Sequence, residues 1–433
     1  MHGWVAICEN VGQGFSMSFA EWQQLGPEAA AREVVRRAGA NLAPQQRTAS
    51  IAALLDQGAL EAAFASASPG PLKGVPYLLK DLFDAHGMAT LGGSAFLADV
   101  RPVPTKDSRI VRDLAVAGSV LAGKTHLFEF AWGLTGQNAH YGDCEHPHFP
   151  GRTSGGSSSG SAVAVAADIV PFAIGTDTGG SVRVPASFCG LYGYRGVPGD
   201  AWISDAVALA PTFDTAGWFT RTGEDMRAAI LALLGPGTMD SAPRGAYLEM
   251  PGLDPEVASA CRSAAFGFTE PAEPAARDEL LHAFSPAAEV YGVVAGVESW
   301  KLHRRWAEKY RSRYGPLLVE RLERARAISP AQVAAVEPSR QRIHQAWEKY
   351  FRENDFLVLA ATPCAALPTT ELTHANRLRL MGLTAPASLH GLPALTLPVS
   401  LPSGLTSGLQ VVFSTARSAA LGWVLEAFGQ SSA

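Results

Sequence analysis

Apolar positions along the chain show two patterns: helical spacing, and short continuous runs of strand length. Residues 18–67 are rich in helix formers whose apolar positions recur at helical spacing, which predicts packing helices. Between residues 72 and 235, short apolar runs of strand length alternate with helical stretches. Such alternation is typical of α/β proteins, so the pattern predicts an α/β fold.

The stretch 106–125 illustrates this alternation. It predicts a helix with a polar N-terminal cap near Asp107. The apolar face of this helix consists of Ile110, Val111 and Leu114. Gly118 suits the position just after the helix, where the left-handed backbone is common, and a short strand is predicted at 119–123.

The segment 250–350 is predicted to be helical throughout. The apolar face of its last predicted helix consists of Ile343, Ala346, Trp347, Tyr350 and Phe351. Strand-like runs joined by Pro and Gly turns return from residue 355 onward. Because the strands resume so late, we expect one domain with a helical insertion rather than two independent domains.

Composition and charge restrict the classes of ligand and location. The chain has 433 residues, of which 47% are hydrophobic and 17% charged, enough for a sizeable core. Its formal net charge of −5 gives no electrostatic reason to bind nucleic acid or an anionic membrane, so small-molecule ligands are favoured. Neither a secretion signal nor a membrane span is expected, and Met17 is a candidate start. The five cysteines form no C-x-x-C pair, which favours a reducing cytoplasm.

Two loops rich in glycine and serine, at 152–160 and 176–181, lie at the ends of predicted regular elements. The first contains Gly156, Ser158 and Gly160 in a G-x-S-x-G pattern, which is the nucleophile elbow of α/β hydrolases. That motif requires a strand directly before it, and the preceding "HPHFPGRTSG" does not resemble one. A phosphate loop is disfavoured as well, because no lysine follows these glycines.

Two further clusters have ordinary explanations. One consists of Cys144, His146 and His148, with His140 nearby. Its C-x-H-x-H spacing matches no common zinc site, so we interpret these residues as polar loop residues and expect no metal. The basic run 301–313 carries Trp306 and Tyr310 on one helical face, which is typical of a solvated helix rather than a nucleic-acid contact.

Three segments taken together are far more specific. They are "KGVPYLLKD" with Lys80, "SGGSSSGSA" with Ser157 and "GTDTGGSVRVPASFCG" with Ser181, and the two serines are 24 positions apart. This combination resembles the amidase signature family, whose hydrolases use a Ser-Ser-Lys triad. The segments "GMATLGGS", "AGKTHLFEFAWGLTGQN", "FDTAGWFTRT" and "HGLPALTLPV" follow in the order usual for the family. The resemblance is strong over 72–235 and moderate over 355–413.

The resemblance implies a fold and a division of the chain. The expected fold is a single large α/β domain, 1–433, with a central mixed sheet covered by helices on both faces. Within it, we expect N-terminal helices at 18–71 and a signature core at 72–235. A variable helical region is expected at 236–350, and the C-terminal part of the core at 351–433.

The resemblance also implies catalytic roles. Ser181 is the expected nucleophile, Lys80 the base, and Ser157 the relay between them. A lysine acts as a base only when its amine is neutral, so its pKa must fall from about 10.4, and apolar neighbours in 78–83 favour this. The alternative interpretation of Lys80 alone is an ion pair with Asp81 or Asp84.

Further site residues carry over from the family. The expected oxyanion donors are the backbone N–H groups of Thr178, Gly179, Gly180 and Ser181. Residues expected to support the loops are Gly156, Ser158, Asp177 and Arg183, with a cis peptide bond before Ser157. The expected substrate pocket consists of Ala131, Trp132, Gly133 and Leu134.

The predicted function is hydrolysis of the C–N bond of a small amide without a cofactor, with a mild preference for a hydrophobic or aryl acyl group. Esters and carbamates remain open, because the same acyl-enzyme route serves all three. We expect a monomer or homodimer. An alternative is the amidase subunit of a glutamine-dependent tRNA amidotransferase, which works in a complex. A scaffold without activity is disfavoured, because Lys80, Ser157 and Ser181 are all present.

Overall fold

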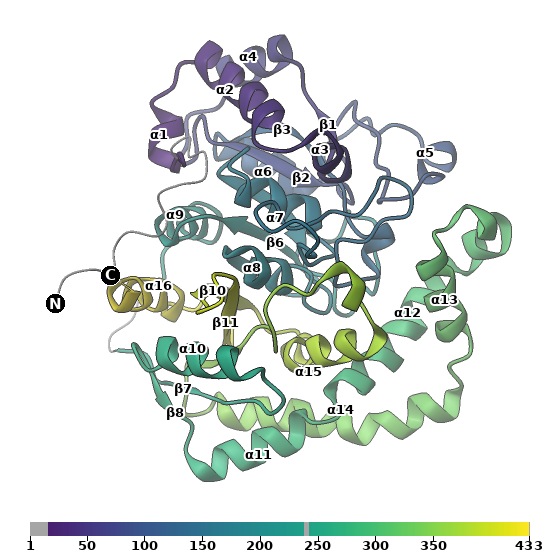
Figure 1. The fold of residues 1–433 in the computed structure, drawn as a ribbon, viewed down its shortest axis with the longest axis vertical. Coiled ribbons are helices and arrows are strands. Elements are labelled where there is room, and N and C mark those ends of the chain that lie inside the picture. The colour runs from purple at the N-terminus through teal and green to yellow at the C-terminus, as the bar shows by residue number, and fades with distance from the viewer. Residues whose placement is uncertain (1–15, 238–241, 433) are drawn as a thin grey trace.

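The computed structural model describes residues 16–237 and 242–432. Within these ranges, eleven strands form one sheet across the molecule (Figure 1). In spatial order they are β1 (Ile51–Leu54), β3 (Val120–Thr125), β2 (Pro76–Lys80), β4 (Phe172–Thr176), β6 (Ala216–Thr220), β5 (Tyr192–Arg195), β10 (Ala394–Ser400), β11 (Thr406–Phe413), β9 (Phe356–Ala360), β7 (Gly245–Tyr247) and β8 (Glu270–Pro271). The sheet is mixed: β2 runs parallel to β3 and β4, whereas β4, β6, β5, β10, β11 and β9 pair antiparallel in turn.

Helices surround this sheet. They are α1 (Phe19–Gln23), α2 (Pro27–Ala40), α3 (Pro44–Ser50), α4 (Gln57–Ala65), α5 (Leu97–Val100), α6 (Arg109–Val116), α7 (Ser159–Ala166), α8 (Arg183–Cys189), α9 (Gly223–Leu234), α10 (Pro255–Ala265), α11 (Pro274–Phe284), α12 (Ala287–Tyr310), α13 (Pro316–Arg326), α14 (Pro330–Tyr350), α15 (His374–His390) and α16 (Ala420–Ser432). Short 3-10 turns lie at Glu129–Ala131, Arg311–Arg313 and Thr369–Glu371.

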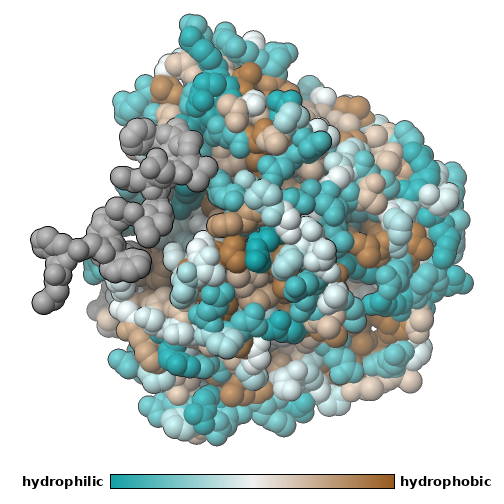
Figure 2. All heavy atoms as spheres, viewed as in Figure 1, coloured by the Kyte–Doolittle hydropathy of each residue, from teal (hydrophilic) through white to brown (hydrophobic). Residues whose placement is uncertain are grey.

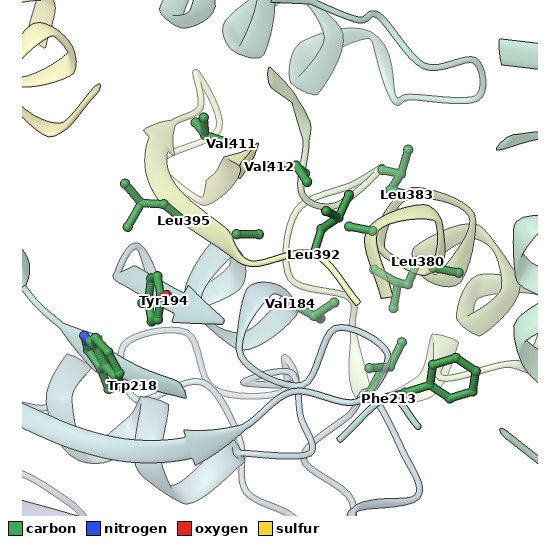
Figure 3. Close-up of a cluster of buried hydrophobic side chains, with 14 of the residues drawn as sticks. Val184, Tyr194, Phe213, Trp218, Leu380, Leu383, Leu392, Leu395, Val411 and Val412 are labelled. Carbon is green, nitrogen blue, oxygen red and sulfur yellow. The ribbon is translucent and has the colours of Figure 1, made fainter. Parts of the chain in front are cut away.

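Two apolar clusters lie on opposite faces of the sheet. Along β2, Tyr77 and Leu79 belong to one cluster and Leu78 to the other, as the alternation of side chains in a strand requires. The Leu78 cluster is covered by the N-terminal helices α2 and α4 and by α7. The other cluster extends to the C-terminal strands and α15, part of which Figure 3 shows. The predicted α/β domain with helices on both faces of a mixed sheet is confirmed.

The N-terminal segment differs from its prediction at one element. Residues 18–67 form four helices, but β1 interrupts them and pairs antiparallel with the edge of β3. The sequence of β1, Ile-Ala-Ala-Leu, has the composition of a helix and no polar alternation. Its extended conformation therefore depends on hydrogen bonds to a distant strand rather than on local propensity.

The predicted helix and strand in 106–125 are confirmed as α6 and β3. The N-cap residue is Ser108, one position after Asp107. Gly118 has a φ of +89° and its N–H donates to the Ala115 carbonyl, as expected just after a helix. The left-handed backbone lets the chain turn directly from α6 into the sheet.

The segment 250–350 is largely helical, with the short strand β8 between α10 and α11. On α14 the predicted apolar face is buried except for Phe351, which caps the helix and is half-buried, and Trp347 donates from Nε1 to the Pro386 carbonyl of α15 at 3.0 Å. Helices α11 to α14 lie along the lower and right side of the molecule in Figure 1. Through α12 and α15 they reach the site described below.

One helical stretch, Pro274–Arg313, is long and apolar enough to cross a membrane by length and composition. It includes α12, whose buried residues are Ala287, Val290, Tyr291, Ala295, Gly296, Ser299 and His303. This face packs against α13, α14 and α15. On the molecular face drawn in Figure 2, hydrophobic and hydrophilic residues are interspersed. The apolar window is 44% buried, so packing against these helices accounts for part of its apolar character.

Candidate active site

Lys80 is the centre of a buried polar cluster. It is the last residue of β2 and is fully buried. Its Nζ lies 2.8 Å from Ser157 Oγ, 2.9 Å from Ser158 Oγ and 2.7 Å from Thr176 Oγ1. The parallel pairing of β2 with β4 places the C-terminal ends of both strands side by side, so Lys80 and Thr176 meet there.

Both carboxylates considered as partners of Lys80 pair elsewhere. Asp81 forms a buried ion pair with Lys124 of β3. Asp84 forms a pair with Arg101, with an N–O distance of 2.9 Å. The ion-pair interpretation of Lys80 is therefore wrong, and the amine is surrounded by hydroxyl groups instead.

These hydroxyls suit a neutral amine. A neutral amine has two N–H donors and one lone pair, so one of the three hydroxyl partners must donate to Nζ. Ser158 Oγ already donates to the Thr176 carbonyl at 3.0 Å, which leaves the Ser157 or the Thr176 hydroxyl for that role. Burial lowers the pKa of Lys80 to about 7, against the opposing effect of Asp177 and Asp214. The amine is therefore substantially neutral near pH 7.

Ser157 is held by a loop that packs closely against its neighbours. The peptide bond between Gly156 and Ser157 is cis. A Cβ at Gly156 would lie 2.1 Å from the Thr135 carbonyl oxygen, so only glycine fits there. The Ser157 carbonyl accepts a hydrogen bond from Phe128 N–H at 3.1 Å.

Ser181 lies just before α8 and lines a cavity with its side chain. The backbone links it to the Lys80 cluster, because Ser158 N–H donates to the Ser181 carbonyl at 3.3 Å. Among the described residues, no hydrogen bond joins the hydroxyls of Ser157 and Ser181. The structure thus brings all three predicted residues to one site, with the Ser181 hydroxyl free to meet a ligand.

The four predicted oxyanion donors fall into two groups. The N–H of Gly180 donates to Asp177 Oδ1 at 2.8 Å, so it is already occupied. None of the described residues accepts from the N–H groups of Thr178, Gly179 or Ser181. These three residues also line the cavity. The available donors are therefore three rather than four.

Asp177 organises the loop beneath these donors. It accepts hydrogen bonds from the backbone of Gly180 and Val182 and from the guanidinium groups of Arg183 and Arg195, all fully buried. Burial opposes ionisation of Asp177, but the two arginines hold its pKa well below its usual range. Arg183 also donates to the Thr384 carbonyl of α15 at 2.7 Å. Asp177 and Arg183, predicted to support the loop, are thus joined to each other and to Arg195 by hydrogen bonds.

The cavity beside Ser181 is narrow. It is lined by Ala131, Trp132, Gly133, Leu134, Thr178, Gly179, Ser181, Leu209, Tyr291, Gly292, Ala295, Gly296, Ser299, Arg377 and Met381. The predicted pocket segment 131–134 is therefore part of its wall. Its volume of about 40 Å³ holds about three water-sized groups, so an aryl ring does not fit this conformation.

Comparison with known proteins assigns the chain to a family. The family model for amidases matches residues 33–291. AtzE, a subunit of the 1-carboxybiuret hydrolase of Pseudomonas sp. (strain ADP), is 32% identical over 369 residues, which cover 79% of this chain and 80% of that protein. The chain belongs to the amidase family.

Other relatives and solved structures agree with this assignment. A glutamyl-tRNA(Gln) amidotransferase subunit of a Picosynechococcus species is 31% identical, covering 84% of this chain and 85% of that protein. Amidase 1 of Arabidopsis thaliana is 43% identical over a shorter region, 39% of this chain and 40% of that protein. A crystal structure of an amidase has a TM-score of 0.82 at 28% identity and covers 96% of this chain and 99% of that one.

Sequence reasoning missed three polar residues of the site in this amidase: one beside Lys80 and two in the cavity wall. Thr176, Tyr291 and Arg377 all contribute polar groups, and the last two come from α12 and α15. A Cβ at Gly179 would lie 2.7 Å from Tyr291 Oη, so the tyrosine packs directly against a predicted oxyanion-donor position. The place of Thr176 at the end of β4 is a signal that could have found it, whereas nothing local marks Tyr291 or Arg377.

Side chains of the other loop motifs of this amidase make structural contacts. Ser158 of the G-x-S-x-G pattern is bonded to Lys80 and the Thr176 backbone, not to a histidine. His146 and His148 are bonded to backbone carbonyls at 3.0 and 2.9 Å. Among the described residues no group of three or more His, Cys, Asp or Glu could hold a metal ion. In the basic run, Trp306 and Tyr310 pack against Phe96.

Proposed function

We propose that this amidase cleaves small amides through an acyl-enzyme on Ser181, with Lys80 as the base and Ser157 as the proton relay. Membership of the family supports C–N hydrolysis of an amide. The observation that carries the assignment of roles is the Lys80 amine, buried among hydroxyls and free of any carboxylate partner among the described residues.

In the first step, Ser181 Oγ attacks the amide carbonyl carbon. Its proton passes to Ser157 Oγ while the Ser157 proton passes to Lys80 Nζ, which becomes an ammonium. This step requires a hydrogen bond between the Ser181 hydroxyl and Ser157 Oγ, and such catalytic hydrogen bonds commonly form only with substrate bound. The carbonyl oxygen becomes an oxyanion, which the N–H groups of Thr178, Gly179 and Ser181 stabilise.

In the second step, the ammonium of Lys80 returns a proton through Ser157 to the nitrogen of the leaving group. The C–N bond breaks, the amine departs, and an ester on Ser181 remains. Water then attacks the carbonyl carbon of this ester, and its proton passes through Ser157 to Lys80. The bond to Ser181 Oγ breaks, and Ser157 returns a proton to that oxygen. The acid product is released and each residue regains its starting protonation state.

The small cavity favours short acyl groups over the aryl groups that the sequence suggested. Esters and carbamates pass through the same acyl-enzyme, and we include them among the substrates. We further propose a cytoplasmic location. The four cysteines in the described part of the chain are buried free thiols, which a reducing compartment maintains.

The test compares propionamide, methyl propionate and ethyl carbamate as substrates of the isolated chain and of Ser181→Ala. Hydrolysis by the wild type alone supports the proposal, and the ranking of the three bonds defines the preferred leaving group. Residual amide hydrolysis by Ser181→Ala above about one hundredth of the wild-type rate would remove Ser181 from its role.

A second candidate is the amidase subunit of a tRNA amidotransferase. The coverage of the glutamyl-tRNA(Gln) amidotransferase relatives, 84% of this chain for one of them, favours it. It predicts partner proteins that copurify with the chain, and ammonia release from L-glutamine that requires them. Hydrolysis of free amides by the isolated chain, with no dependence on added partners, favours the first candidate instead.

A further inference from the structure

Arg377 is an arginine of α15 that lines the cavity beside Ser181. Its Nε is excluded from solvent and has no hydrogen-bond partner. Within the part of the chain that the structure describes, no carboxylate lies within ion-pair distance of its guanidinium group, and none of the hydrogen bonds involves that group. The residue as a whole is half-buried, so its charge is only partly solvated and has no counter-charge among the described residues.

The other buried guanidinium groups near the site show what a structural role involves. Arg183 and Arg195 share the Asp177 carboxylate and donate to the backbone carbonyls of Thr384 and Leu392. Those contacts tie α8 and β5 to α15 and β10. Arg377 makes no comparable contact with the described residues, so the fold does not use its donors.

The surroundings of Arg377 offer no anion from the described part of the chain. Burial lowers the pKa of Arg377, and the nearby Arg324 acts in the same direction. The opposing influence comes from Tyr291, a phenol whose own pKa burial raises, so it is neutral at pH 7. Both Arg377 and Tyr291 line the same cavity. The wall of the catalytic cavity thus presents hydrogen-bond donors and unbalanced positive charge.

A carboxylate is the ligand that fits this wall. A guanidinium group binds a carboxylate through two parallel N–H donors, and the Tyr291 hydroxyl supplies a third donor. The cavity that holds both Ser181 and Arg377 has room for about three water-sized groups. The three heavy atoms of a carboxylate fill that room, so the linker to the scissile carbonyl must be short, and we take it to be one or two methylene groups.

Accepting the function proposed above, we infer that Arg377 is a specificity-determining residue that selects amides with a carboxylate at the far end of a short acyl chain. The substrate class is the monoamide of a short dicarboxylic acid. Arg377 then has no part in proton transfer and acts by binding the acyl group.

The experiment compares charged substrates with neutral substrates of the same shape. Malonamate is paired with 3-methylbutanamide and succinamate with 4-methylpentanamide, because an isopropyl group replaces the carboxylate at similar volume. Affinity is measured by calorimetry in the Ser181→Ala background, which does not depend on turnover. Two variants are used. Arg377→Met keeps a long unbranched side chain but removes its charge. Arg377→Lys keeps the charge but lacks the two parallel N–H donors of a guanidinium group.

The matched control is Arg379→Met on the same helix. Arg379 is exposed and pairs with Asp254 at the surface, with an N–O distance of 2.6 Å. It contacts neither the cavity nor the Lys80 cluster. Thermal unfolding of each variant accompanies the titrations, and we expect Arg377→Met to unfold no earlier than Arg379→Met, because Arg377 is half-buried and has no counter-charge among the described residues, whereas Arg379→Met breaks an ion pair.

We expect Ser181→Ala to bind one of the two charged amides about 10- to 100-fold more tightly than its neutral counterpart. Arg377→Met should abolish that preference, Arg377→Lys should retain part of it, and Arg379→Met should leave it unchanged. The inference is overturned if charged and neutral amides bind alike, if no amide binds, or if Arg377→Met keeps the preference. Turnover by the wild type is scored separately: preferential binding without hydrolysis would refute the proposed function alone, and hydrolysis without preference would refute this inference alone.

Discussion

Lys80 Nζ lies 2.8 Å from Ser157 Oγ in a setting where neither neighbouring aspartate pairs with the amine. This contact joins a residue at the end of a central strand to one in the loop before α7. The amine is thereby fixed by hydroxyl groups, which accept from an ammonium and also tolerate a neutral amine. Its protonation state consequently responds to pH in the neutral range.

The first prediction concerns the pH dependence of hydrolysis. Burial lowers the pKa of Lys80 to about 7, and only the neutral amine accepts a proton from Ser157. Because the neutral fraction increases with pH, kcat/KM should rise about tenfold per pH unit below 7 and level off above it. Rates of propionamide hydrolysis between pH 5 and 9 test this. A profile that is flat below pH 7, or a Lys80→Met variant with appreciable activity, would point to another base.

The second prediction concerns the free energy of unfolding. The pKa of Lys80 falls from an ordinary value of 10.5 to about 7 in the folded protein, so the unfolded chain binds more protons between these values. Stability contributed by this group should therefore rise with pH from 7 to 10.5, by up to about 1.4 kcal/mol per pH unit. Urea unfolding of the wild type and of Lys80→Met at pH 7.5 and 9 isolates the effect as a difference. Equal pH dependence of both proteins would show that the amine is charged when folded.

The third prediction separates the two serines that contact Lys80. If Ser157 is the relay as proposed, Ser157→Ala should abolish hydrolysis with little loss of stability. Ser158→Ala should be destabilised by about 1–3 kcal/mol, because the buried backbone N–H and carbonyl of Thr176 both lose their partner. Activity at a temperature where each variant is folded, together with urea unfolding, distinguishes them. The assignment of the relay would be reversed if Ser158→Ala were inactive and Ser157→Ala active.

The parts of this structure that were predicted depend on local signals. Short apolar runs of strand length between residues 72 and 235 include β2, and the helix and strand in 106–125 lie where their spacing placed them. Ser157, Ser181 and Asp177 belong to loops in which some positions have no room for a side chain. At Gly156, for example, a Cβ would clash with the Thr135 carbonyl. Such loops retain a recognisable sequence because few residues fit them.

The parts that were missed depend on contacts between distant segments. Tyr291 and Arg377 have the helical spacing of an ordinary core residue and an ordinary surface residue, and only the packing of α12 and α15 brings them to Ser181. The strand β1 likewise exists because β3 offers an edge for pairing. Gly180 was predicted as an oxyanion donor, yet its N–H is taken by Asp177, a detail that depends on the turn geometry.

The fourth prediction concerns Asp177. Asp177→Asn would leave Arg183 and Arg195 buried without a counter-charge, so the protein should lose about 3–5 kcal/mol of stability. The matched control is Glu249→Gln, which breaks the exposed pair with Arg262 and should change stability by less than about 1 kcal/mol. Urea unfolding at pH 7 measures both. Similar stability of the two variants would mean that the buried arginines find other partners.

The last prediction concerns the space at Gly179. A Cβ there would lie 2.7 Å from Tyr291 Cζ and Oη, so Gly179→Ala must displace either the tyrosine or the loop that carries the oxyanion donors. Hydrolysis should fall by about tenfold or more, since small misplacements of these donors are costly. Gly382→Ala on α15 is the control, because a Cβ there meets nothing within 4 Å and should leave activity unchanged. Adding Tyr291→Phe to Gly179→Ala removes one of the two clashing atoms and should restore part of the lost rate. Full activity of Gly179→Ala alone would show that the ring moves freely and does not fix the position of the oxyanion loop.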